Sequence, residues 1–389
     1  MRHTADGIRK EDDTAEITAL KVFYTWRDAG PARDVRFEKT FAWDIPLMEG
    51  YDFEVVPNTS TEPGTHHRKG LINPDLVERV KAWKPDAVHI TGYNYVSHGQ
   101  AIKELSKAGI AVVFRGDSHL LDGRGPWWKW WLKKSWLSKV YRWPKGFAYV
   151  GQANRDYYRA FGVPERKLFY VPHTIEVARF AEPNAEMEAK ALAWRREMGI
   201  PDDHFVFLYA AKLEPRKRPV ELLEAFLRAD LPNTTLLFVG SGELESALKK
   251  RAFESRQSSV VSRQIKTTEN GQLKTANCGH RVVFVPFQNQ SAMPLVYRLG
   301  DALVLPSGYG ETWGLAVNEA QACGRPSLVS DCVGCARDIV REGENGMIFR
   351  TDDWGDCVCA MQRMANGEWR SKRDVIRAEA WKFDAARGA

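Results

Sequence analysis

Cysteine and long hydrophobic runs are both scarce in this chain of 389 residues. Six cysteines are too few to hold such a chain together by disulfides, so we expect hydrophobic cores in a reducing compartment. Apolar runs such as residues 108–114 stop well short of the about 18 residues that a membrane span requires. The N-terminal sequence MRHTADGIRKEDDTAEI lacks the apolar core of a signal peptide. These absences predict a cytoplasmic protein.

Four of the cysteines form two closely spaced pairs, Cys332 with Cys335 and Cys357 with Cys359. Zinc is one interpretation of such pairs. The second pair lies in a stretch typical of a helix, where neighbouring side chains point apart, so we expect no metal site. The net charge of +6 gives a mild preference for anionic partners, and we expect no nucleic acid among them.

The chain length suits two domains of moderate size, each able to bury its own core. From residue 73 onward, short apolar runs alternate with helical patterns, which indicates α/β domains with parallel sheets. Asn73 and Pro74 favour the start of a helix that continues to Lys84, and a further helix is expected to end near Lys107. The expected strands cover residues 86–91, 110–114, 148–151, 168–171, 205–210, 235–239, 282–285, 302–305 and 327–330.

The strand pattern lapses into a polar, helix-favouring stretch at residues 175–200, where we place the link between domains. We therefore expect a first domain over residues 1–178, a second over 179–375, and the start of a returning helix over 376–389. Residues 253–280 are rich in Ser, Gln, Thr and Asn and are expected to form an inserted surface loop.

Three features of the second half follow expected strands, at the edge where open α/β sheets bind ligands. Lys212 and Lys217 bracket a turn and suit a diphosphate, although a solvated run of charge is the alternative. Gly240 and Gly242 bring backbone amides close to a phosphate or sugar, unless they only make a tight turn. Phe287 offers a flat surface to a nucleotide base, or it belongs to the core.

The fourth feature is the sequence GETWGLAVNEA. Gly314 and Leu315 are expected to begin a helix, and their amides then favour an anion. Glu311 and Glu319 can accept hydrogen bonds from sugar hydroxyl groups, one from a hexose and the other from a ribose. Helical rise would place them about 10 Å apart, enough to straddle a diphosphate. The alternative is a capping role for Glu311 and an exposed position for Glu319.

Residues 126–145, PWWKWWLKKSWLSKVYRWPK, combine six tryptophans with lysines and an arginine. Tryptophan and lysine together suit an anionic membrane surface. The alternative is a helix that packs its tryptophans into the domain core and solvates its lysines. Trp127, Trp128, Trp130 and Trp131 cannot all share one helical face, which favours the surface role.

The segment GETWGLAVNEAQACGRPSLVSD resembles the E-x7-E segment of retaining family 4 glycosyltransferases, and AAKLEPRKRPVELLEAF resembles their G-R-L-x-x-x-K-G segment. VGSGELE, FVPFQNQSAMP, DALVLPS and VGCARDIVREGENGMIF extend the likeness over residues 205–350. The resemblance implies the GT-B architecture, in which two Rossmann-like domains face each other across a cleft. It also implies that Lys212 and Lys217 bind the donor diphosphate, with Glu311 at the sugar and Glu319 at the ribose.

The first half is similar to the acceptor domain of a subset of these enzymes, with two departures. The usual first βαβ unit should precede LKVFYTW, so this domain is expected to lack it. Many relatives carry a histidine after the strand that VVF matches, whereas this chain reads RGDSH, which makes Asp117 and His119 candidate catalytic residues. In the second half, Lys212 replaces the usual arginine and Ala211 the usual glycine, so charge remains but the bidentate fork does not.

The resemblance implies transfer of a hexosyl unit from a nucleoside diphosphate sugar, with retention of configuration and without a cofactor or metal. Two alternatives stay open: a sugar-nucleotide epimerase on the same fold, and a sugar-nucleotide-binding or membrane-surface protein without activity. The expected partners are a nucleotide sugar, a lipid-linked or polysaccharide acceptor, and an anionic membrane surface contacted through residues 126–145. Such contact would place the protein at the inner face of the membrane.

Overall fold

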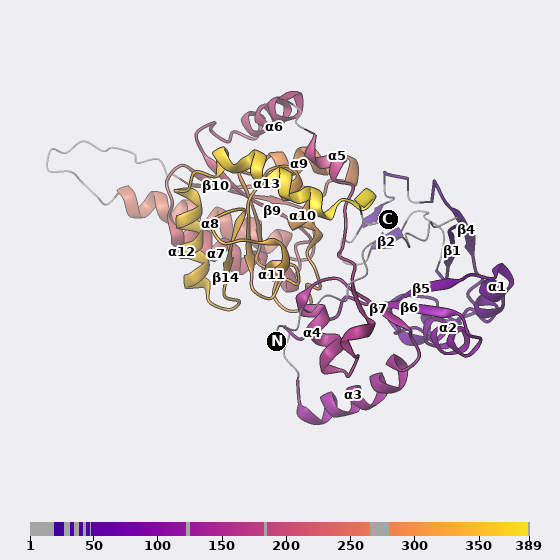
Figure 1. The fold of residues 1–389 in the computed structure, drawn as a ribbon. Coiled ribbons are helices and arrows are strands. Elements are labelled where there is room, and N and C mark those ends of the chain that lie inside the picture. The colour runs from indigo at the N-terminus through magenta and orange to yellow at the C-terminus, as the bar shows by residue number, and fades with distance from the viewer. Residues whose placement is uncertain are drawn as a thin grey trace, which may run out of the picture.

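A computed structural model describes residues 19–26, 32–34, 39–41, 44–46, 48–121, 125–182, 185–264 and 280–387. Figure 1 shows two α/β domains, the first drawn in indigo to magenta and the second in magenta to yellow. Each is built on a parallel sheet, as the sequence predicts. The boundaries expected at residues 178 and 375 stay predictions.

The second domain contains a sheet of six parallel strands in the order β11-β10-β9-β12-β13-β14. Their bounds are β9 (Phe205–Ala210), β10 (Thr234–Val239), β11 (His280–Val285), β12 (Ala302–Leu305), β13 (Ser327–Ser330) and β14 (Gly346–Phe349). This is the order of the doubly wound Rossmann fold, and its direction of winding reverses between β9 and β12. The loops after these two strands therefore flank the point where such sheets bind ligands.

Helices cover both faces of this sheet because successive strand residues point to opposite sides. Val206 and Leu208 pack with one helix layer, and Phe207 and Tyr209 with the other. The first layer holds α5 (Val177–Ala181), α6 (Ala185–Glu197), α9 (Met293–Arg298), α10 (Leu315–Ala322), α11 (Ala336–Ile339) and α13 (Arg373–Ala380). The second holds α7 (Pro219–Ala229), α8 (Glu245–Gln264) and α12 (Trp354–Ala365).

The first domain has a sheet of four parallel strands in chain order, β5-β6-β7-β8. The strands are β5 (Ala87–Thr91), β6 (Ala111–Arg115), β7 (Gly146–Tyr149) and β8 (Leu168–Tyr170). The helices are α1 (Leu76–Trp83), α2 (Val96–Lys107), α3 (Trp127–Tyr141) and α4 (Gln152–Ala160). Strand β7 begins and ends two residues before the expected strand at 148–151. The core of this domain gathers aromatic residues, including Phe114, Phe147 and Tyr158.

A separate parallel pair, β1 (Lys21–Tyr24) with β4 (Asp52–Val55), precedes the four-stranded sheet. The segment LKVFYTW therefore contains β1, the first described strand, and the expectation of a missing first βαβ unit stays a prediction. The described residues between β1 and β4 include a short antiparallel pair, β2 (Ala32–Asp34) with β3 (Lys39–Phe41), and no helix.

Asn73 has a different role from the expected helix cap. Its buried side chain donates to the backbone oxygens of Thr25, Val56 and Pro57 at 2.9–3.1 Å, and the helix begins only at Leu76. The amide thus ties the ends of β1 and β4 to α1. The expectation was wrong because it weighed only the local pattern, whereas a buried amide must satisfy its donors wherever carbonyl groups are available.

The loop expected from residue 253 was also wrong at its start, because α8 continues to Gln264. Serine and glutamine are compatible with a helix interior when the helix has already been started by stronger residues. The rest of that expected loop, at residues 265–279, lies outside the described residues.

The chain leaves β8 and enters the second domain through residues 171–176, where its C-terminal segment returns to meet it. Ile175 donates its amide to the Phe383 oxygen at 3.1 Å, and Ala385 donates to the Ile175 oxygen at 2.9 Å. The Asp384 carboxylate accepts from the amide of Val177 at 3.0 Å. The crossing point is therefore fixed by backbone bonds to the other end of the described chain.

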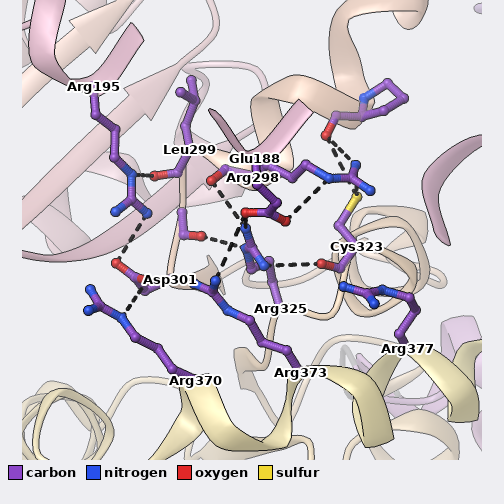
Figure 2. Close-up of polar contacts among 12 residues, drawn as sticks. Glu188, Arg195, Arg298, Leu299, Asp301, Cys323, Arg325, Arg370, Arg373 and Arg377 are labelled. Atoms are coloured by element: carbon purple, nitrogen blue, oxygen red, sulfur yellow. Dashed lines mark hydrogen bonds and ion pairs between the residues drawn. The ribbon is translucent and has the colours of Figure 1, made fainter. Parts of the chain in front are cut away.

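A network of arginines around the buried Asp301 carboxylate holds the returning segment on the second domain (Figure 2). Asp301 is buried and accepts from Arg195 at 3.1 Å, Arg370 at 3.3 Å and Arg373 at 2.8 Å. Burial opposes ionisation of this carboxyl, but the three guanidinium groups outweigh it and hold the pKa of Asp301 below its ordinary value. The carboxylate thereby joins α6, the start of β12 and the segment around α13.

Glu188 makes a similar connection beside it. Its carboxylate contacts Arg325 at 2.7 Å and Arg298 at 3.4 Å, and both arginines are fully buried. Arg298 also donates to the backbone oxygens of Phe180 and Glu182, which fixes α5. The buried charges are therefore paired and hydrogen-bonded, as buried charges must be.

We predict that Asp301→Ala lowers the free energy of unfolding by about 3–5 kcal/mol, because it leaves the buried Arg195 guanidinium without its carboxylate. Chemical denaturation measures the loss. Asp202→Ala removes a solvent-exposed ion pair with Arg196 and serves as the matched control, with little expected change. Equal effects of the two substitutions would show that the network does not hold the returning segment.

Candidate functional site

The loops after β9 and β12 lie side by side because these strands pair, with Phe207 opposite Ala302 and Leu208 opposite Leu303. The loop after β9 carries Lys212 and Lys217, and the loop after β12 carries Glu311. Both loops leave the carboxyl edge of the sheet at the reversal of strand order. The structure thus brings the predicted cations and the first predicted carboxylate to one place.

Lys217 and Glu311 are in direct contact across these loops. The Lys217 ammonium group pairs with the Glu311 carboxylate, which also accepts from the Ser307 hydroxyl at 2.9 Å. Both charged side chains are largely shielded from solvent. A cation and an anion held together here form a site that can receive a ligand carrying both phosphate and hydroxyl groups.

Glu311 lies on a loop and not on a helix. Helix α10 begins at Leu315, and Gly314 before it has φ 97°, in the left-handed region. The expected distance of about 10 Å between Glu311 and Glu319 assumed that one helix carries both residues, and this assumption was wrong. The capping alternative for Glu311 is also wrong, because its carboxylate binds Lys217 and Ser307.

Gly314 is required at the start of α10 for two reasons. Its φ of 97° is unfavourable for other residues, and a Cβ there would lie 2.9 Å from side-chain atoms of both Leu305 and Val333. The close packing aims the first turn of α10 at the carboxyl edge of the sheet. Leu315, the first helical residue, is exposed. Within this turn the Val317 amide donates to the Gly314 oxygen at 2.9 Å, and the amides before it lie ahead of the first helical carbonyl groups.

Glu319 lies one turn further along α10 and accepts from the Tyr297 hydroxyl at 2.5 Å. Burial raises the pKa of Glu319 above its ordinary value, while the hydrogen bond from Tyr297 and the nearby charge of Arg179 oppose this shift. The alternative of an exposed Glu319 is therefore wrong. A half-buried carboxylate held by a tyrosine is suited to accept further hydrogen bonds from ligand hydroxyl groups.

The loop after β9 is bonded to neighbouring loops through Arg216 and Arg218, which were not predicted as site residues. Arg216 donates to the Gly310 oxygen at 2.8 Å, and its own oxygen accepts from the Gly308 amide at 3.0 Å. Arg218 pairs with Asp352 at 2.7 Å. The run PRKR was the available signal, since it places arginines on both sides of Lys217.

Lys212 is half-buried, and its backbone oxygen accepts from the buried Tyr209 hydroxyl at 2.8 Å. This bond fixes the turn that directly follows β9. Lys212 therefore lies on the same loop as Lys217, close to the end of the strand.

Gly240 allows the loops after β9 and β10 to touch. A Cβ on Gly240 would lie 2.1 Å from the Ala211 oxygen, and one on Gly242 would lie 2.5 Å from the Leu213 oxygen. The Gly240 amide donates to the Val285 oxygen at 3.0 Å, so it is not a bare donor for phosphate as we expected. The first glycine of this turn thus serves close packing.

Phe287 is half-buried, and its amide donates to the Ser241 hydroxyl at 3.3 Å. That bond joins the loop after β11 to the loop after β10. Phe287 therefore sits on the carboxyl edge of the sheet with the other candidates and is not a fully buried core residue.

Two residues of the first domain contact the Glu311 loop. His119 donates from Nε2 to the Glu311 backbone oxygen at 3.1 Å, and its Nδ1 accepts from the Leu121 amide at 3.3 Å. Asp117 accepts from the Thr312 hydroxyl at 2.8 Å. The structure thus brings both first-domain candidates to the second-domain site, across the junction of the domains.

Arg115 and His173 lie beside the same loop and were not predicted. The His173 ring lies 5.5 Å from the Trp313 ring, centroid to centroid, and Arg115 donates to the Pro172 oxygen at 3.2 Å. Burial and the charge of Arg115 hold the pKa of His173 below its ordinary value. The sequence offered one signal for a role of Arg115 in the site, namely its position at the end of strand β6.

Within the described residues, no group of three or more His, Cys, Asp and Glu side chains is placed to hold a metal ion. Cys332 and Cys335 are free thiols in the loop after β13, while Cys357 and Cys359 are free thiols on α12. The zinc interpretation of these pairs therefore has no support. A search of the described residues also finds no helix long and apolar enough to cross a bilayer.

Two family descriptions match almost the whole chain. "Glycosyltransferase Family 4" matches residues 23–179, and "Glycosyl transferases group 1" matches residues 191–262 and 263–382. The chain belongs to the family 4-like glycosyltransferases with the GT-B fold. Each domain is thus matched by one of the two family descriptions. The loops after β9 and β12, which carry the candidate residues, lie inside the match to the group 1 description.

The curated relatives are similar over part of their length. A D-inositol 3-phosphate glycosyltransferase of Actinosynnema mirum is 30% identical over 197 residues, which are 49% of this chain and 42% of that protein. An uncharacterized glycosyltransferase of Methanocaldococcus jannaschii is 27% identical over 57% of this chain and 52% of its own. The chain thus matches about half the length of these relatives.

Solved structures share the fold. Anabaena HepE in complex with UDP superposes with a TM-score of 0.63 at 17% identity, covering 87% of this chain and 84% of that one. The sucrose-phosphate synthase of Thermosynechococcus elongatus gives a TM-score of 0.57 at 19% identity, over 80% and 73%. At such identities the likeness establishes architecture alone.

We predict that Glu319→Gln raises the melting temperature at pH 7.5. A carboxyl whose pKa is raised on folding does not lower the stability of the fold while the pH is below its ordinary pKa near 4.5. It destabilises the fold as the pH rises through the pKa of the folded state. The amide avoids this penalty, so the gain should shrink toward pH 4. Glu197→Gln, at an exposed position of α6, is the control and should melt like the parent at both values. A lower melting temperature for Glu319→Gln at pH 7.5 would contradict the account.

Proposed function

We propose that this glycosyltransferase moves a hexosyl unit from a nucleoside diphosphate sugar to an acceptor, with retention of anomeric configuration. The observation that carries the proposal is the contact of Lys217 with Glu311 between the loops at the reversal of strand order. One partner suits a phosphate and the other a sugar hydroxyl. Both sit where doubly wound sheets bind nucleotides.

In the proposed complex the donor diphosphate lies between Lys212, Lys217 and the first turn of α10. Binding separates Lys217 from Glu311, because the phosphate replaces the carboxylate as the partner of the ammonium group. Glu311 then accepts from the hexose hydroxyls, and Ser307 keeps that carboxylate in place. Glu319 accepts from the ribose, supported by Tyr297.

Catalysis in this proposal is mainly electrostatic. The lysines and the helix amides stabilise the negative charge that develops on the leaving diphosphate, and we expect no requirement for a metal ion. The acceptor hydroxyl attacks from the face that the departing phosphate leaves, and a phosphate oxygen takes its proton. Asp117 and His119 keep the Glu311 loop in register with the first domain, where the acceptor would enter.

The titles of similar structures and the names of relatives suggest the first substrates to test. HepE is described in complex with UDP-glucose, and the relative from Actinosynnema mirum is named a D-inositol 3-phosphate glycosyltransferase. Turnover of UDP-sugars is to be measured with and without this acceptor and with lipid-linked sugars, in the presence of a chelator. The anomeric proton coupling of the product reports the configuration.

Each result of this assay selects one function. A new glycoside with the donor's configuration supports the proposal. A changed sugar nucleotide without acceptor would indicate an epimerase. Tight binding of UDP-sugars without any turnover, over all acceptors tested, would indicate a protein that only binds sugar nucleotides.

We predict different kinetic effects for the two carboxylates. Glu319→Ala should raise the KM for the donor about 10- to 150-fold, since a ribose contact made by a charged group persists in the ground state. Glu311→Ala should mainly lower kcat, because contacts to the sugar matter most as the bond breaks. Glu197→Ala is the control. Equal rises in KM for both variants would contradict this division of roles.

A further inference from the structure

Helix α3 has two faces with different surroundings. Toward the core of the first domain, Leu137 and Tyr141 are buried, and the Trp130 ring meets Phe161 edge-on with 4.3 Å between centroids. The opposite face exposes four large apolar side chains, those of Trp127, Trp128, Trp131 and Leu132. The interpretation that α3 buries all its tryptophans in the core is therefore wrong.

The exposed side chains form one continuous stripe. With about 3.6 residues per turn, positions 127, 128, 131 and 132 share one side of the helix, and Lys129 and Lys134 border that side. Trp127 is 79% exposed and Trp131 is 63% exposed. Residues 126–145 contain no aspartate or glutamate. The stripe is thus an apolar surface that lysines of its own helix border.

A pocket of about 250 Å³ lies between α2 and the C-terminal half of α3. Its walls contain the cations Arg68, Lys103, Lys139 and Arg142, and none of the described residues that line it is a carboxylate. Arg142 lies 4.7 Å from the centre of the Trp143 ring, which is also part of the wall. Such a pocket suits a phosphate group.

We propose that α3 docks on an anionic phospholipid bilayer, with the tryptophan stripe in the interface and a lipid phosphate in the pocket. Tryptophan prefers the interface of a bilayer, and basic side chains beside it are attracted to anionic headgroups. A nucleic acid would satisfy the cations, but it offers no apolar layer for Leu132 and the tryptophans beside it. The stripe and the pocket together therefore favour a membrane.

The docking surface lies close to the acceptor side of the enzyme. The pocket includes Tyr93, which follows β5 at the carboxyl edge of the first sheet, where Asp117 and His119 follow β6. Tyr93 stacks on Phe114 of β6 with 5.8 Å between ring centroids. In Figure 1, α3 runs along the lower rim of the first domain, away from the sheet of the second. Docking through α3 would leave the donor site free.

The test is sedimentation of the full chain with vesicles of phosphatidylglycerol and phosphatidylcholine, compared with phosphatidylcholine alone. We expect partition onto the anionic vesicles to be at least about tenfold stronger and to weaken as salt screens the charges. Trp127→Ala with Trp131→Ala should reduce it about tenfold. Arg68→Gln with Arg142→Gln should reduce it about 30-fold, near a factor of five for each charge.

Matched controls come from the second domain. Phe253→Ala removes an apolar side chain that is 62% exposed on α8, and Arg228→Gln with Lys250→Gln removes two exposed charges. All variants should keep the parent's melting temperature, because the changed side chains are exposed. The proposal would be overturned if the protein did not sediment with vesicles, or if it sedimented equally with both kinds. It would also be overturned if the control variants lowered sedimentation as much as the α3 variants do. Tighter binding to an oligonucleotide than to the anionic vesicles would overturn it as well.

Discussion

The loop at residues 311–313 receives hydrogen bonds from both domains, and the geometry of the site depends on it. From the second domain, Gly334 donates to the Glu311 oxygen and Cys335 to the Trp313 oxygen, each at 3.0 Å. From the first domain, His119 donates to the same Glu311 oxygen, and Asp117 binds Thr312. Because the backbone of Glu311 is held from two sides, its carboxylate is fixed opposite Lys217. A change in the relative position of the domains must therefore move the carboxylate or break these bonds.

The second domain combines a rigid frame with charged loops at one edge. The buried carboxylate of Asp301 and the partly exposed carboxylate of Glu188 bind arginines from α6, α9 and the C-terminal segment, which fixes the helices around the sheet. The loops at the carboxyl edge of the sheet differ from this frame, because their charged side chains are only half-buried. Lys217 and Glu311 pair there with each other, and a ligand can replace either one as the partner of the other. Burial raises the pKa of Glu319, so the negative charge of this carboxylate destabilises the fold when no ligand is bound. Such costs are typical of residues kept for binding.

Much of the second domain could be predicted from the sequence, because its buried parallel strands are continuous apolar runs. The strand at 205–210 was predicted with its observed bounds, and those at 302–305 and 327–330 likewise. The pairing of Lys217 with Glu311 could not be predicted from residue types, since the two are 94 positions apart and meet only through the strand order. The roles of Asn73 and the Gly240 amide depend on carbonyl groups supplied by distant strands. Local patterns contain no information on such partners.

The most direct test of the proposed donor site is a crystal structure of the protein with a nucleoside diphosphate. The account predicts that the Lys217 ammonium group leaves Glu311 and binds a phosphate oxygen, with the second phosphate at the first turn of α10. It also predicts that Glu319 accepts from the ribose hydroxyls while keeping its bond from Tyr297. A nucleotide bound elsewhere, with the contact between Lys217 and Glu311 intact, would contradict the central claim.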